Sequence, residues 1–81
     1  MSHRYRPDVL RQLAAHGIAP VAETPPQLVH DFVNDLYRYE LRRLRDRLLQ
    51  KQIAKPDYSA HVVQVRGRYP LLSLKLWQWV E

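Results

Sequence analysis

Apolar residues recur at intervals of three and four along most of the chain, which is the spacing of an amphipathic α-helix. The first such stretch runs from Pro7 to about His16, because proline suits the first helical position and Asp8 complements the positive end of a helix. Gly17 can adopt the left-handed conformation that ends a helix, and Ile18 follows where a Schellman motif places an apolar contact. The pattern predicts a short first helix with a defined end.

The longest predicted helix runs from Pro25 to Lys55, with Thr24 as its N-cap and Gln27 completing a capping box. No Gly or Pro interrupts it before Pro56, which is expected to end it. Eight apolar residues fall within about half of the helix circumference and predict a buried face. They are Leu28, Val29, Phe32, Val33, Leu36, Tyr39, Leu44 and Leu48.

The segment after Pro56 fits two structures. In the first, Asp57 caps a third helix that ends before Pro70. Its apolar positions would be Tyr58, Val62, Val65 and Tyr69. In the second, residues 61–66 form a β-strand that pairs with residues 71–80. We favour the helix, because the apolar spacing of four, three and four matches a helical face.

The C-terminal tail, residues 71–80, is rich in leucine and contains Trp77 and Trp79. Tryptophans near Lys75 are also typical of a membrane interface. In so small a protein, however, each indole ring offers roughly 150–250 Å² of surface for burial. We therefore expect both rings in the core, with the tail covering it.

These elements predict an all-α fold, in which one long central helix is flanked by two shorter helices and an aromatic C-terminal tail; the alternative is an α+β fold with a C-terminal hairpin. The 81 residues are 46% hydrophobic and 26% charged, which is ordinary for a globular chain and suits one domain over residues 1–81. No signal-peptide pattern and no apolar run of about 20 residues is present, so we expect a cytoplasmic protein without membrane contact.

Candidate catalytic chemistry is sparse in the sequence. The absence of cysteine excludes disulfides, thiol nucleophiles and thiolate zinc sites. The four histidines and the carboxylates of Asp31 and Asp35 lack the spacing of known metal-ligand motifs, and no Gly-x-Ser-x-Gly or phosphate-binding loop occurs. We therefore predict a non-enzymatic protein that uses no metal or other cofactor.

Positive charge is concentrated in one segment. Residues 38–55 contain seven basic and two acidic side chains, whereas the rest of the chain balances six against six. Arg38, Arg42 and Arg45 form an outward stripe on the predicted helix that could follow the phosphates of a nucleic acid. The competing interpretation is an ordinary solvated face, in which Arg38 pairs with Asp35 and Arg42 pairs with Asp46.

Glu40 falls inside the apolar half of the long helix, together with Arg43 and Arg47. A carboxylate at the edge of a core needs a partner, because an unpaired buried charge costs several kcal/mol. We therefore predict a partly buried ion pair, completed by one of these arginines or by Arg66 or Arg68.

The length of the central helix suggests self-association. Thirty-one residues span roughly 45 Å, whereas a compact chain of this size is about 30 Å across. Leu49 and Ile53 lie one turn apart on the side away from the main apolar face, so we expect them to bind a partner. The sequence thus predicts a protein-interaction module, self-associating as a dimer or binding another protein, with nucleic-acid binding as the alternative.

Overall fold

Each of the three α-helices has a proline in its first turn, where the missing amide hydrogen breaks no helical hydrogen bond. The helices are α1 (Pro7–Ala15), α2 (Pro26–Leu49) and α3 (Lys55–Gly67). The structure, a computed structural model, describes residues 2–81; it is 66% helical, and this part of the chain contains no strand. The all-α prediction is confirmed, and the alternative of a C-terminal hairpin is wrong.

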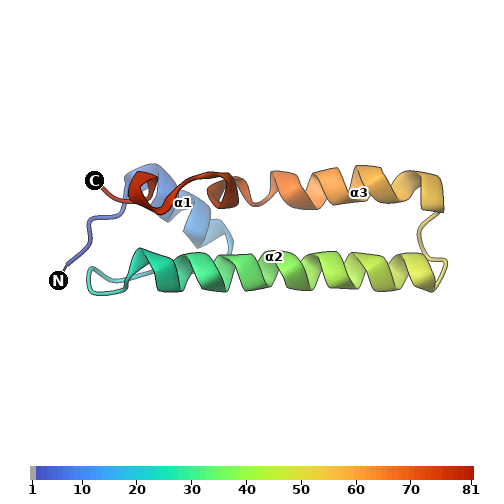
Figure 1. Cartoon of the computed structure of the whole chain (residues 1–81), viewed down its shortest axis with the longest axis horizontal. Helices are drawn as coiled ribbons and strands as arrows, with labels where there is room; N and C mark the ends of the chain where they lie inside the picture. The colour runs from blue at the N-terminus through green and yellow to red at the C-terminus, as the bar shows by residue number, and fades with distance from the viewer. Residues whose placement is uncertain (1) are drawn as a thin grey trace.

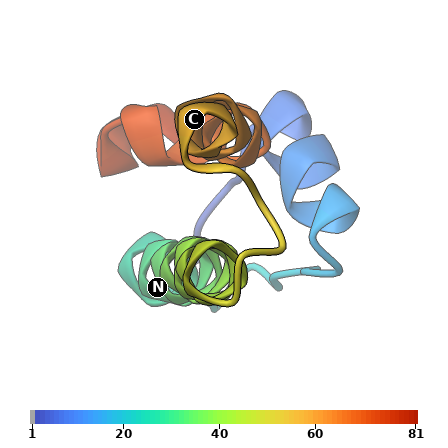
Figure 2. The same ribbon diagram turned by 90° about the vertical axis from the view of Figure 1, so that its right-hand side faces the viewer.

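The helices form an elongated two-layer structure (Figure 1). Helix α3 runs antiparallel to α2, and two short 3-10 helices, η1 (Pro70–Ser73) and η2 (Leu76–Gln78), continue from α3 toward the start of α2. Helix α1 covers one side at that end, as the end-on view shows (Figure 2). The molecule measures 48 × 18 × 15 Å and its radius of gyration is 15.0 Å, compared with about 12 Å expected for a compact chain of 81 residues.

The core is much thicker at the end that holds α1 than at the far end. Its buried apolar residues are Tyr5, Val9, Leu13, Val29, Val33, Leu44, Ile53, Val65, Tyr69, Leu71 and Trp79. Both chain ends contribute to it, and Tyr5 forms an isolated antiparallel bridge with Val80. At the far end only α2, α3 and the turn between them remain (Figure 1), so that half of the molecule is a two-helix arm.

Helix α1 ends as the sequence predicts. Gly17 has a φ of +76°, and its amide donates to the carbonyl of Ala14 at 2.9 Å. The amide of Ile18 donates to the carbonyl of Leu13, also at 2.9 Å. These two bonds are those of a Schellman motif, with glycine in the left-handed position.

The start of α2 differs from the predicted capping box. Pro25 is held in an extended conformation (φ −64°, ψ 136°), because a residue that precedes a proline is disfavoured in the α conformation. The helix therefore begins one residue later, at Pro26, and Thr24 does not cap it. Its hydroxyl instead accepts a hydrogen bond from the Val21 amide at 3.2 Å, while Gln27 donates to Asp31 at 2.8 Å.

Helix α2 ends at Leu49, so the prediction of a continuous helix to Lys55 is wrong. Lys51 adopts a φ of +61°; its amide donates to the carbonyl of Leu48 at 3.0 Å, and the Gln52 amide donates to the carbonyl of Arg47 at 2.9 Å. This is again a Schellman pattern, with lysine in the position that glycine usually occupies. The chain then turns back, and Pro56 opens α3 instead of ending α2.

The early end of α2 overturns the prediction for Ile53. Because the chain has left the helix, Ile53 does not lie one turn from Leu49 on an outer face. Its side chain is buried in the core, with 6% of its surface exposed, whereas Leu49 is 68% exposed. The two residues therefore do not form one surface.

Replacing Lys51 with glycine is a direct test of this turn. A left-handed conformation costs a residue with a side chain about 1 kcal/mol relative to glycine, so Lys51→Gly should raise the free energy of unfolding by about 0.5–1 kcal/mol. If α2 instead continued through position 51, glycine would lower it by about 1 kcal/mol. Urea unfolding followed by circular dichroism distinguishes a gain from a loss.

The third helix forms as predicted, although Asp57 lies in its first turn and not at its cap. In the tail, only one of the two tryptophans joins the core. Trp79 has no exposed surface, whereas 67% of Trp77 is exposed, so the prediction that both rings are buried is wrong for Trp77. The two short 3-10 helices explain the difference, because they do not place both rings on the side that faces α2.

Candidate interaction surfaces of the long helix

Four large apolar side chains of α2 are exposed, and three of them lie on the same side of the helix. Leu28, Phe32 and Tyr39 are 62%, 54% and 56% exposed, although their angles on the helix predict that they are buried. Spacings of four and seven residues place them along one side of the helix, and we call them the α2 stripe. They are exposed because the opposite layer covers only the narrow strip of α2 that carries residues such as Val29 and Val33.

The α2 stripe borders an apolar groove at the start of the helix. The connector between α1 and α2 forms the other wall, and the groove encloses about 400 Å³. Its lining residues include Ile18, Pro20, Leu28 and Phe32. The connector is held in place by the Tyr5 hydroxyl, which donates to the Thr24 carbonyl at 2.6 Å. One end of α2 thus presents a shaped apolar surface.

The basic side chains lie mainly on the two-helix arm, which we define as residues 38–68. It carries nine basic and three acidic side chains, a formal net charge of +6, while the rest of the chain sums to −1. Within the described residues, Arg68 is the one cation of the arm with a carboxylate at ion-pair distance. The arm therefore carries a largely uncompensated positive charge.

Arg38, Arg42 and Arg45 lie together on one side of the arm, as the sequence predicts. They surround a shallow hollow of about 300 Å³ with Leu41 and with Tyr58 of α3. Neither predicted pair, Arg38 with Asp35 or Arg42 with Asp46, is found among the ion pairs of residues 2–81. Tyr58 was not predicted to join this surface, because sequence spacing does not show which residue of α3 faces it.

On the other side of α2, Glu40 forms an ion pair with Arg68 at the end of α3, with 3.3 Å between Oε1 and Nη2. The Glu40 side chain is 32% exposed. Arg43 and Arg47 line the same groove without pairing with Glu40, and the Arg43 guanidinium lies 5.9 Å from the centre of the Tyr39 ring. The structure thus selects one of the four arginines that the sequence offered as partners.

Tyr69 connects this ion pair to the core. Burial, followed by hydrogen bonding and electrostatic repulsion from Glu40, raises the pKa of Tyr69 to about 12, while Arg68 acts in the opposite direction. The ring stacks on His16, with 4.5 Å between ring centres, and the His16 Nε2 atom lies 2.9 Å from the Arg68 carbonyl oxygen. The end of α1 is thereby fixed to the end of α3.

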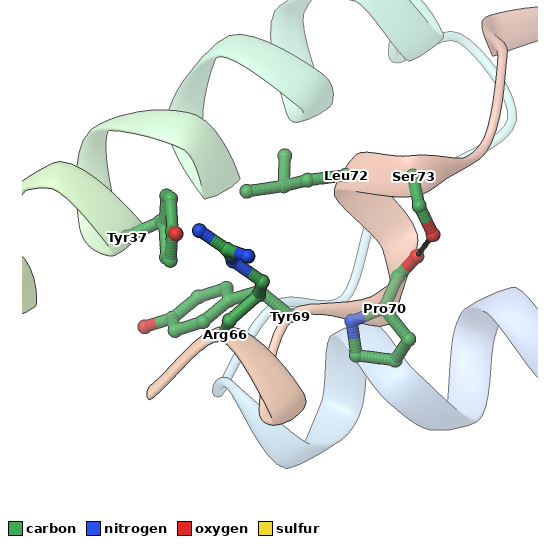
Figure 3. A pocket seen from close by; sticks show the side chains of 6 residues that line it. All are labelled: Tyr37, Arg66, Tyr69, Pro70, Leu72 and Ser73. Atoms are coloured by element: carbon green, nitrogen blue, oxygen red, sulfur yellow. Dashed lines mark hydrogen bonds between the residues drawn. The ribbon is translucent and has the colours of Figure 1, made fainter. Parts of the chain in front are cut away.

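A second hollow, of about 380 Å³, opens beside Tyr69 (Figure 3). Tyr37 and Tyr69 form aromatic walls, with their ring centres 5.3 Å apart, and the Arg66 side chain extends toward Tyr37. Pro70, Leu72 and Ser73 complete the lining, and the Ser73 hydroxyl donates to the Pro70 carbonyl at 2.7 Å. The Ser73 hydroxyl therefore satisfies a backbone carbonyl within η1.

Neither a membrane span nor a metal site is evident in the described part of the chain. No helix between residues 2 and 81 combines the length and apolar content that crossing a bilayer requires. The same residues contain no group of three or more His, Asp or Glu side chains placed to hold a metal ion. No family model, curated protein or solved structure matches the chain.

Proposed function

We propose that the protein is a non-enzymatic interaction module that self-associates through the α2 stripe. The observation that carries this proposal is the exposure of Leu28, Phe32 and Tyr39 along one side of a regular helix. Large apolar side chains exposed along one side of a helix are typical of protein contacts, and aromatic residues contribute most of the binding energy in many interfaces. The surface differs from the predicted pair of Leu49 and Ile53, because Ile53 is buried.

The accessible surface area of the molecule supports a second copy of this chain as the partner of the α2 stripe. The chain exposes 6071 Å², whereas a compact protein of 9.7 kDa exposes about 5100 Å². The excess of about 1000 Å² is close to the roughly 800 Å² that each partner buries in a standard interface. A dimer along α2 would therefore bring the exposed area per chain near that of a compact protein.

The charges along α2 favour an antiparallel arrangement of the two copies. Residues 26–37 carry two carboxylates and no lysine or arginine, whereas residues 38–49 carry five arginines and two carboxylates. Parallel packing would place the positive halves beside each other. Antiparallel packing about a two-fold axis instead brings the basic half of each copy toward the acidic half of the other.

Sedimentation equilibrium at about 100 µM tests this proposal. We expect a dimer mass with a micromolar dissociation constant, and Phe32→Asp should weaken the dimer at least about 30-fold, because a desolvated aromatic anchor commonly contributes 2 kcal/mol or more. Val63→Asp is the matched control, since Val63 is 64% exposed on α3, outside the stripe. A wild-type protein that remains a monomer at this concentration, or equal weakening by both variants, would contradict the proposal.

A further inference from the structure

The arm contains a groove between α2 and α3 that the α2 stripe does not use. Two adjoining hollows, of about 140 and 660 Å³, form it, and they share Leu44, Arg47, Val65 and Arg68. Leu44 and Val65 are buried and form the floor, while the arginines are exposed on opposite walls. Glu40 and Arg43 line the smaller hollow; His61, Gln64 and Gly67 line the larger one.

Hydrogen-bond donors dominate the walls of this groove. Three guanidinium groups, one imidazole and one side-chain amide face it, and Glu40 is the single carboxylate among the lining residues. That carboxylate is engaged with Arg68 at 3.3 Å, and within residues 2–81 no carboxylate lies at ion-pair distance from Arg43 or Arg47. Planar guanidinium groups bind phosphate oxygens through two parallel hydrogen bonds, so the groove is suited to phosphate groups.

We propose that this groove binds successive phosphates of a nucleic-acid backbone. The groove is open, and its arginines come from two helices, Arg43 and Arg47 from α2 and Arg68 from the end of α3. A single free phosphate would occupy only part of these two adjoining hollows, whereas a chain of phosphates can extend through both. Such contacts determine affinity and position but read no base sequence.

Fluorescence anisotropy with a labelled 20-nucleotide single strand of mixed sequence tests the proposal. The Arg43→Gln/Arg47→Gln double variant removes two groove charges, and Arg38→Gln/Arg42→Gln removes the same charge from the opposite side. Counterion release of about 0.7 per phosphate contact predicts a loss of roughly 25-fold at 0.1 M salt for the groove variant, with a log–log salt slope shallower by about 1.4. The control pair should lose much less.

Glu40→Gln is expected to strengthen nucleic-acid binding in the same groove, the opposite of the arginine variants. The substitution removes the only carboxylate of the groove and frees Arg68 to contact a phosphate. One added phosphate contact should tighten binding by up to about fivefold at 0.1 M salt. A merely structural role for Glu40 would weaken binding or leave it unchanged. Circular dichroism of each variant establishes that the fold is retained.

Other results would overturn the proposal. These are no rise in anisotropy at low salt, an equal loss for both arginine pairs, displacement of the probe by pyrophosphate at equal phosphate concentration, or equal binding of polyglutamate. Displacement by pyrophosphate would mean that the groove binds free phosphates. Equal binding of polyglutamate would mean that it binds acidic polypeptides. Sedimentation of the Arg43→Gln/Arg47→Gln variant keeps this test separate from the proposed self-association, because a lost dimer and a lost nucleic-acid complex are then measured independently.

Discussion

Replacing Trp79 with alanine is expected to lower the free energy of unfolding by about 3–5 kcal/mol, which is the usual cost of removing a buried tryptophan side chain. Trp79 has no exposed surface, and its backbone carbonyl accepts a hydrogen bond from the Arg6 amide at 3.0 Å. It therefore joins the C-terminal tail to the N-terminal segment. A chain of this length has about 4–12 kcal/mol of total stability, so the expected loss is a large share of it.

Trp77→Ala is the matched control, because this ring is 67% exposed, and we expect a loss below about 0.5 kcal/mol. Trp79→Phe should recover much of the stability, since it restores most of the ring and removes an indole N–H that has no partner among the described residues. Urea unfolding of the three variants gives the comparison. Equal losses for the two alanine variants would mean that the tail does not pack as described.

Raising the pH through the range of tyrosine ionisation is expected to remove about 2 kcal/mol of stability between pH 9 and pH 11.5. The pKa of Tyr69 is raised from 10.0 to about 12 in the folded protein. A group whose pKa is higher in the folded state binds its proton more tightly there, so its contribution is complete below pH 10 and is lost as the pH approaches 12. Burial also raises the pKa of Tyr5, which acts in the same direction.

Tyr69→Phe removes the ionisable hydroxyl and keeps the ring that stacks on His16, so the decline in stability above pH 10 should become shallower. Tyr39→Phe is the control, because Tyr39 is 56% exposed. Unfolding free energies in urea at pH 9 and pH 11.5 provide the measurement. If wild type and Tyr69→Phe lose the same stability, the environment assigned to Tyr69 is wrong.

The parts of the fold that local chemistry specifies could be predicted from the sequence. Gly17 and Ile18 define the end of α1 because glycine occupies the left-handed position without strain. The end of α2 uses the same hydrogen-bond pattern, but Lys51 occupies that position, and lysine gives no signal of a left-handed residue. Because this turn carries no sequence signal, the pattern predicts Ile53 on an outer surface.

The candidate surfaces depend on tertiary packing, and the sequence reveals them less well. Apolar periodicity identifies the residues of α2 that could be buried, but it does not show how wide the covering layer is. Phe32 and Tyr39 are exposed because that layer leaves their side of α2 uncovered. Glu40 could be recognised as needing a partner, whereas the choice of Arg68 follows from where α3 ends.

Self-association through antiparallel α2 helices can be measured directly, because the chain contains no cysteine and accepts a single nitroxide label at Gln50→Cys. If a two-fold axis crosses α2 between positions 34 and 38, the label lies about 12–16 residues from the axis. At 1.5 Å per residue, double electron–electron resonance should then give a distance of roughly 35–50 Å between the two copies. A distance under about 20 Å would show parallel helices, and the absence of dipolar modulation at about 100 µM protein would show that the copies do not pair; either result would contradict the proposed dimer.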